Sequence, residues 1–210
     1  MHSHRTTRAL AALTLGLALT VTAAACGSDN NSDASSQVST TGHNDADVAF
    51  ATDMIQHHAQ ALSMVDLTVG RPLDPEVTKL AEAIREAQAP EIETMVDWLT
   101  EWDEKIPATM RDHTNAGHDM NDMDMGDSMG GTDDGMPGMM SADDMTALQD
   151  APDAAFQNMW LEMMVKHHEG AVEMAKAEQT DGQYKPAVDL AEGIISSQTE
   201  EIDTMSALHD

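Results

Sequence analysis

Pairs of adjacent histidines, each flanked by methionines, occur at two places in the sequence, 110 residues apart. The first segment runs from Met54 to Met64 and reads MIQHHAQALSM; the second runs from Met164 to Met174 and reads MVKHHEGAVEM. Imidazole nitrogen and thioether sulfur are both metal ligands, and together they favour a soft ion such as Cu(I). The candidate metal ligands are therefore Met54, His57, His58, Met64, Met164, His167, His168 and Met174.

The spacing inside each segment indicates a helix with one buried face. At about 100° per residue, Met54, His57, His58, Ala61 and Met64 fall on a single broad face. His57 and His58 diverge by about 100°, so they cannot both point at one centre. We expect one histidine of each pair to point inward and its neighbour to lie at a helix–helix seam. The sequence leaves open which of the two points inward.

The similarity between the two halves extends beyond the histidine segments. Nine of the sixteen positions in residues 80–95 are identical to their counterparts in residues 190–205, without a gap. Such a match indicates a duplicated helical hairpin, and neither hairpin can cover its own apolar stripe, so the two should pack together. The predicted fold is all-α, a four-helix bundle from two hairpin units spanning 44–104 and 142–210. The helices are expected at residues 45–69, 75–102, 152–178 and 186–208, with a bend at Pro90.

Buried imidazoles need partners for both of their ring nitrogens. Glu91 and Glu201 occupy equivalent positions in the two hairpins, and we expect them to orient imidazole N–H groups or to act as occasional ligands. Met95 and Met205 are either further ligands or core packing. Zinc is the main competitor of copper, because histidine with glutamate can bind it tetrahedrally, and silver(I) would mimic Cu(I).

The N-terminus has the pattern of a secretory signal. Basic residues precede an apolar stretch from Ala9 to Ala25, which is short for a membrane span. The sequence Ala-Ala-Ala-Cys that ends at Cys26 resembles a bacterial lipobox; an ordinary signal peptide is the alternative. We predict a signal over residues 1–25, a lipid anchor at Cys26 and a disordered tether over residues 26–43. The protein would then sit on the outer face of the bacterial cytoplasmic membrane.

The cysteine count and the net charge exclude several classes of binding partner and metal site. Cys26 is the only cysteine, which excludes an intramolecular disulfide and a thiolate metal site. The net charge of −28 excludes a nucleic-acid-binding surface and disfavours contact with anionic lipid headgroups, so membrane contact is expected through the lipid anchor alone. Such a charge favours cations, although acidity for solubility explains it equally well.

Residues 105–141, between the two hairpins, lose all periodicity and are rich in Asp, Gly, Asn, His and Met. We predict a disordered linker. A solvated spacer has no packing use for methionine, so we interpret the linker as an auxiliary metal-collecting segment; a plain spacer and an oxidant-scavenging tract are the alternatives. The residues expected to capture metal are His113, His118, Met120, Met123, Met125 and Met129.

The doubled pattern Met-(Ile/Val)-x-His-His-x-x-Ala-(Leu/Val)-x-Met is followed in each half by Gln-x-x-Glu-Ile-x-x-Met, at residues 88–95 and 198–205. This combination resembles the bacterial secreted family known as DUF305, over residues 45–102 and 152–209. The resemblance implies a ferritin-like four-helix architecture, and some members are implicated in copper binding and copper tolerance outside the cytoplasm. The long Met/His/Asp insertion between the halves departs from the average member.

These observations predict a copper-binding lipoprotein that sequesters or hands over metal without catalytic turnover. Two alternatives stay open: a structural or partner-binding bundle whose histidines only bond internally, and a metal-dependent redox enzyme. A di-iron carboxylate oxidase is rejected, because it needs Glu-x-x-His on two helices, and Met54 and Met164 stand three residues before His57 and His167. A protein partner and the oligomeric state are left open.

Overall fold

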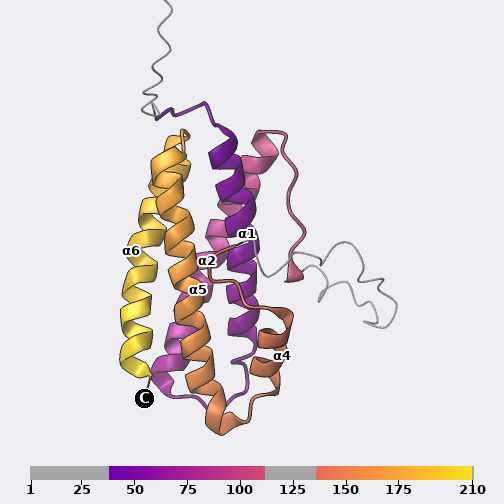
Figure 1. The fold of residues 1–210 in the computed structure, drawn as a ribbon, viewed down its shortest axis with the longest axis vertical. Helices are drawn as coiled ribbons and strands as arrows, with labels where there is room; N and C mark the ends of the chain where they lie inside the picture. The colour runs from indigo at the N-terminus through magenta and orange to yellow at the C-terminus, as the bar shows by residue number, and fades with distance from the viewer. Residues whose placement is uncertain (1–37, 112–135, 210) are drawn as a thin grey trace, which may run out of the picture. The chain divides into compact units, whose positions relative to one another are not determined.

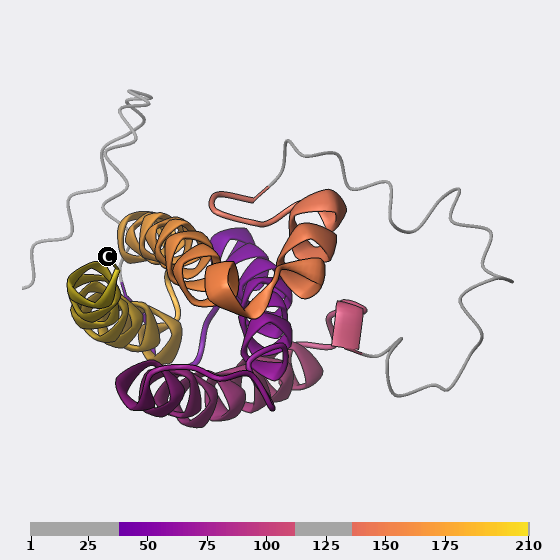
Figure 2. The same ribbon diagram turned by 90° about the horizontal axis from the view of Figure 1, so that it is seen from below.

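The structure is a computed structural model that describes residues 38–111 and 136–209. Within those residues the regular elements are all helices: α1 (Asp45–Asp66), α2 (Pro75–Glu101), α4 (Ala142–Asp150), α5 (Asp153–Asp181) and α6 (Lys185–Leu208). The four long helices form a bundle of two helical hairpins, as predicted, and α4 is a short helix that precedes α5 (Figure 1, Figure 2). No helix in the described part of the chain combines the length and apolar character needed to cross a membrane.

The apolar core of the bundle is divided into two clusters. One lies near the end of α1 and the start of α5, and it includes Met64 and Trp160. The other lies near the start of α1 and the end of α5, and it includes Met54 and Ala175. In every long helix the stretch between its contributions to the two clusters carries polar residues. The bundle therefore holds a polar layer between two apolar cores.

Side-chain caps explain where two of the helices start. Asn44 caps α1, since its side chain accepts hydrogen bonds from the N–H groups of Ala46 and Asp47. Ser141 caps α4 in the same way, with Asp144 completing the capping box. Asp74 precedes Pro75 at the start of α2, but its carboxylate makes no capping bond. It accepts a hydrogen bond from the Gln157 side chain instead, which ties α2 to α5.

Helix α2 continues through Pro90, where the sequence predicts a bend. Pro90 has no N–H to donate to the carbonyl one turn earlier, yet the helix has no break at that position. The Thr94 hydroxyl bonds the Pro90 carbonyl. The two hairpins therefore remain comparable in length, although only the first carries a proline in its second helix.

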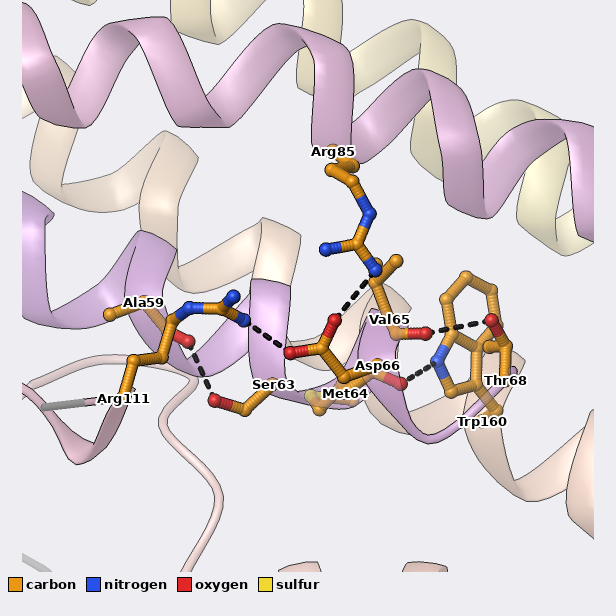
Figure 3. A network of polar contacts seen from close by, with 9 residues as sticks. All are labelled: Ala59, Ser63, Met64, Val65, Asp66, Thr68, Arg85, Arg111 and Trp160. Atoms are coloured by element: carbon orange, nitrogen blue, oxygen red, sulfur yellow. Dashed lines mark hydrogen bonds and ion pairs between the residues drawn. The ribbon is translucent and has the colours of Figure 1, made fainter. Parts of the chain in front are cut away.

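Helix α1 ends at Asp66, three residues earlier than expected. After it the backbone N–H groups of Thr68 and Val69 bond the carbonyls three residues earlier, as in a turn. Figure 3 shows the contacts at this end: the Asp66 carboxylate accepts from Arg85 on α2 and from Arg111, and the Thr68 hydroxyl bonds the Val65 carbonyl. The indole N–H of Trp160 donates to the Met64 carbonyl at 2.9 Å. These bonds take up backbone and side-chain groups at the end of α1 and fasten it to α2 and α5.

Two boundaries of the predicted disordered segments shift in the structure. Residues 38–43, the expected end of the tether, are fixed: the Ser39 backbone bonds the Gln183 carbonyl and the Lys185 N–H, both at 2.7 Å. The His43 ring stacks on Trp102 with centroids 4.3 Å apart. Residues 136–141, the expected end of the linker, are bonded to α1. Both segments order because backbone groups find partners on the bundle, which hydrophobic periodicity does not report.

Candidate metal centre

The polar layer of the bundle contains both histidine pairs. His57 and His58 come from α1, His167 and His168 from α5, and none has more than 1% of its surface exposed. The layer is completed by residues from the other two helices. These are Gln88 and Glu91 from α2 and Gln198 and Glu201 from α6.

His57 and His167 point to the centre of the bundle. Their rings are in contact, with centroids 3.8 Å apart and planes tilted by 40°. His57 Nε2 also lies 3.0 Å from the carbonyl oxygen of Pro137. A carbonyl can only accept, so His57 carries its proton on Nε2 and presents an unprotonated Nδ1.

His58 and His168 face the seam inside their own hairpin. His58 Nε2 lies 2.7 Å from Glu91 Oε2, and His168 Nε2 lies 2.8 Å from Glu201 Oε2. Each carboxylate accepts the Nε2–H, and Nδ1 of both rings has no partner among the described residues. The orientation that the sequence left open is thus the same in both halves: the first histidine of each pair is central, and the second pairs with a glutamate.

Most of the ring nitrogens in this layer have no partner among the described residues. The unpartnered atoms are Nδ1 of His57, His58, His167 and His168, and Nε2 of His167. An unbonded buried polar atom costs about 1–3 kcal/mol, so leaving five of them is expensive unless something else binds there.

Burial keeps the two central rings neutral. Burial, reinforced by the His58 ring, lowers the pKa of His57 to about 3, against a smaller opposing effect of the bond to Pro137. Burial and the His57 ring lower the pKa of His167 well below its ordinary value. A neutral imidazole can bind a metal ion without first losing a proton. Both central rings are therefore in the form that ligates metal.

The candidate methionines border the layer in two sets. Met54 and Met95 belong to one apolar cluster, and Met174 packs against it half-buried. Met64, Met164 and Met205 belong to the other cluster, fully buried. Each methionine of one set has its repeat counterpart in the other set. The counterparts, 110 residues apart, are Met54 and Met164, Met95 and Met205, and Met64 and Met174. Each set thus draws on both halves of the chain.

Within the described residues, no group of three or more His, Cys, Asp or Glu side chains lies close enough to hold a metal ion. A site made only of imidazole and carboxylate, as zinc favours, is therefore not assembled here. Unpartnered imidazole nitrogens between two sets of thioethers do fit a soft ion.

Sequence reasoning missed three glutamines. Gln88 and Gln198 are 2% exposed, and both amide atoms of Gln88 and the Oε1 of Gln198 have no partner among the described residues. The sequence did offer a signal for these two, because both repeats carry glutamine at this position. Gln60 is also buried, and its side chain bonds the backbone of Met140. No signal in the local pattern reveals that contact, because its partner is 80 residues away.

Some predicted residues lie outside the described part of the chain. This applies to the lipidation site Cys26 and to the metal-capturing residues of the linker, which are His113, His118, Met120, Met123, Met125 and Met129.

Comparison with known proteins places this geometry in a family. The sequence profile of the family described as "Domain of unknown function (DUF305)" matches residues 47–209. Among curated proteins, none matches the chain.

Several solved structures share the fold. A DUF305 protein from Streptomyces coelicolor is 31% identical with a TM-score of 0.63, covering 78% of this chain and 91% of that one. A DUF305 fragment from Deinococcus radiodurans is 25% identical, with a TM-score of 0.62 and coverage of 79% and 95%. CopM in its Cu(I)-bound form is 26% identical, with a TM-score of 0.58 and coverage of 77% and 94%. CopM is also known in Ag-bound, Cu(II)-bound and apo forms. With the family profile covering both hairpins and the histidine segments within them, the chain belongs to the DUF305 family.

Proposed function

We propose that this protein binds copper outside the cytoplasm, with Cu(I) as the favoured ion, and sequesters it or hands it over. The observation that carries the proposal is the polar layer: four buried histidines whose five unpartnered nitrogens lie between two sets of methionines. CopM, which shares the fold at 26–27% identity, is known in Cu(I)-bound, Cu(II)-bound and Ag-bound forms, which supports the assignment.

The expected ligands follow from the hydrogen bonds. Nδ1 is the free nitrogen of His57, His58 and His168, because their Nε2 atoms are engaged with Pro137, Glu91 and Glu201. His167 offers either nitrogen. Thioethers from the bordering sets complete the coordination, drawn from Met54, Met64, Met164 and Met174, with Met95 and Met205 as further donors. Glu91 and Glu201 orient the imidazoles and raise their basicity.

A metal titration of the full chain tests the proposal. The variant pair His57→Asn and His167→Asn removes the central donors, and His209→Asn, an exposed histidine near the C-terminus, serves as control. We expect wild type and control to take up Cu(I) with the same stoichiometry and affinity, and the double variant to lose most of both. Equal Cu(I) binding by all three folded proteins contradicts the proposal.

X-ray absorption on the copper-loaded protein separates the candidate ions and ligands. Sulfur and nitrogen scatterers together support the Met/His site. A shell of nitrogen and oxygen alone excludes the thioether ligands. A higher affinity for Zn²⁺ than for Cu(I) in competition excludes the soft-ion assignment.

We also propose that the protein is a lipoprotein anchored through Cys26. The support is the signal-like N-terminus ending at that cysteine and the name of the Streptomyces coelicolor neighbour, which describes a secreted protein. Replacing Cys26 with Ser should move the protein from the membrane fraction to the soluble extracytoplasmic fraction. An unchanged distribution contradicts the anchor and leaves the metal site untouched.

The copper is proposed as cargo, without catalytic turnover. The support is the burial of the layer, which gives a small substrate no exposed surface next to the histidines. Oxygen consumption by the copper-loaded protein with excess reductant is expected to match that of the protein-free control. Sustained consumption that disappears in the double histidine variant would establish a redox enzyme instead.

A further inference from the structure

A short non-helical segment, Met136 to Met140, lies against the polar layer; we call it the strap. It crosses α1 and α5 before the chain turns into α4 (Figure 1). The Pro137 carbonyl accepts from His57 Nε2. The side-chain amide of Gln60 pairs with the Met140 backbone, donating to the carbonyl at 2.9 Å and accepting from the N–H at 2.7 Å.

The strap also lies directly against the backbone of α5. Gly138 has φ of 77°, and a Cβ there would lie 2.6 Å from the Lys166 carbonyl oxygen and 2.9 Å from Gly170 Cα. A Cβ at Gly170 would collide with the Pro137 carbonyl. Two glycines are therefore needed for the strap to approach α5 this closely.

The two anchor points of the strap are equivalent positions of the duplication. Gln60 and Gly170 are 110 residues apart, the same offset that relates the histidine pairs. In the first half this position is Gln60, whose side chain bonds the strap. In the second half it is Gly170, whose lack of a side chain leaves room for the strap. The strap thus explains why this position differs between two otherwise similar segments, and it makes the two halves unequal, since only His57 gains a bond.

The histidines cannot receive an ion without some part of the protein moving, because all four are at most 1% exposed. We propose that the strap is the gate of the polar layer, and that copper enters and leaves when the strap lifts from Gln60 and Gly170. This inference rests on the proposed function. When closed, the strap holds the Nε2 proton of His57 through Pro137 and so positions its Nδ1 for the ion.

The strap costs less to displace than any helix around it. Helices α1 and α5 bury apolar side chains in both core clusters along their length. Of the strap residues only Met140 is buried, and the other four are half-buried. Local opening follows the segment with the fewest buried contacts. Lifting the strap breaks three hydrogen bonds and withdraws one side chain, that of Met140, from a core cluster, while the helices keep their own core contacts.

Two variants loosen the strap from opposite sides, each with a matched control. Gly170→Ala adds the colliding Cβ on α5; its control is Gly193→Ala on α6, where a Cβ meets nothing within 4 Å. Gln60→Ala removes both bonds to Met140; its control is Gln56→Ala, whose amide bonds only within its own helix turn. The full-length chain is loaded with Cu(I) under reducing, oxygen-free conditions. Transfer of Cu(I) to an excess of a colorimetric chelator is then followed, together with hydrogen exchange at the Met140 amide.

We expect both strap variants to release Cu(I) about tenfold faster than wild type, with a parallel rise in Met140 amide exchange, and both controls to match wild type. Faster amide exchange with an unchanged release rate overturns the gate, as does unchanged exchange in both strap variants. A wild-type protein that binds no Cu(I) refutes the proposed function instead, so the two failures are distinguishable.

Discussion

His57 and His167 stand at equivalent positions of the two repeats, and their rings are in contact at the centre of the bundle, with centroids 3.8 Å apart. The duplication therefore brings its two copies into contact at the metal-binding motif itself. Met64 lies seven residues after His57 on α1, and Trp160 lies seven residues before His167 on α5. The Trp160 indole N–H donates to the Met64 carbonyl. These two contacts fix the antiparallel register of the central helix pair.

The contact between the two rings predicts that the halves do not bind metal independently. We expect His57→Asn and His167→Asn to be non-additive in Cu(I) affinity, with an interaction free energy of at least about 0.5 kcal/mol in a double-mutant cycle. The same cycle between His57→Asn and His209→Asn should be additive, because His209 is exposed near the C-terminus. Additivity in the first cycle shows that the two half-sites are separate.

The glutamates that pair with His58 and His168 should set the affinity of their half-sites. Glu91→Gln and Glu201→Gln keep an acceptor for the Nε2–H but remove the charge, so we expect Cu(I) affinity to fall about 10- to 100-fold. Glu93→Gln and Glu200→Gln are controls on the same two helices, since both side chains are exposed. Competition with a chelator of known affinity measures the difference. If the control variants lose as much affinity, net charge is responsible and the hydrogen bonds are not.

Changing methionine to leucine should distinguish a role in metal binding from a role in core packing. Met54→Leu with Met164→Leu keeps the buried volume, so the free energy of unfolding should change by less than about 1.5 kcal/mol. Cu(I) affinity should fall clearly, because leucine has no sulfur. Met95→Leu with Met205→Leu decides by the same measurement whether those residues are ligands or filler. Met159→Leu, half-buried against one cluster, is the control that should leave binding unchanged.

The periodicity of the sequence predicts the fold more completely than it predicts the site. The 110-residue offset and the helical spacing were enough for two hairpins and for a buried face that includes His57 and His167. Which histidine of each pair is central was not readable, because neighbours on a helix differ by about 100° and packing angles decide between them. The pairing with Glu91 and Glu201 settles the orientation, and it depends on contacts between helices.

The strap was beyond prediction for a different reason. Its five residues have no periodicity, and the sequence around them predicts only a linker. Its place is set by the amide of Gln60 and by missing side chains at Gly138 and Gly170, contacts that span 80 residues or come from the lack of a Cβ. Patterns of apolar residues do not report such contacts. Order at residues 38–43 was missed in the same way.

Asp47, in the first turn of α1, should be a strong determinant of stability. Its buried carboxylate accepts from the N–H of Asn44 and from the N–H groups of Gln183 and Tyr184 in the α5–α6 turn. Asp47→Ala leaves these donors without their partner and should cost about 2–4 kcal/mol of unfolding free energy. Asp45→Ala, exposed in the same helix turn, should cost less than about 1 kcal/mol. Urea denaturation compares the two; similar losses would show that the turn contacts contribute little.

The carboxyl group of Glu178 should make stability depend on pH. Glu178 is 2% exposed, and its carboxyl fits against Gly182, where a Cβ would collide with it. Burial, with the nearby carboxyl groups of Asp47 and Asp181 as smaller causes, raises the pKa of Glu178 from 4.5 to about 8.

Between pH 4.5 and about 8 the folded state therefore holds a proton on Glu178 that the unfolded state has lost. Stability from this group is fully present below pH 4.5 and is lost as the pH rises through about 8. Glu178→Gln keeps the neutral shape, so its advantage in unfolding free energy over wild type should grow steadily across this window. Glu173→Gln, exposed on the same helix, should run parallel to wild type at every pH. Urea denaturation at a series of pH values gives the comparison. A constant difference between Glu178→Gln and wild type would mean that Glu178 ionises in the folded protein as it does in the unfolded chain.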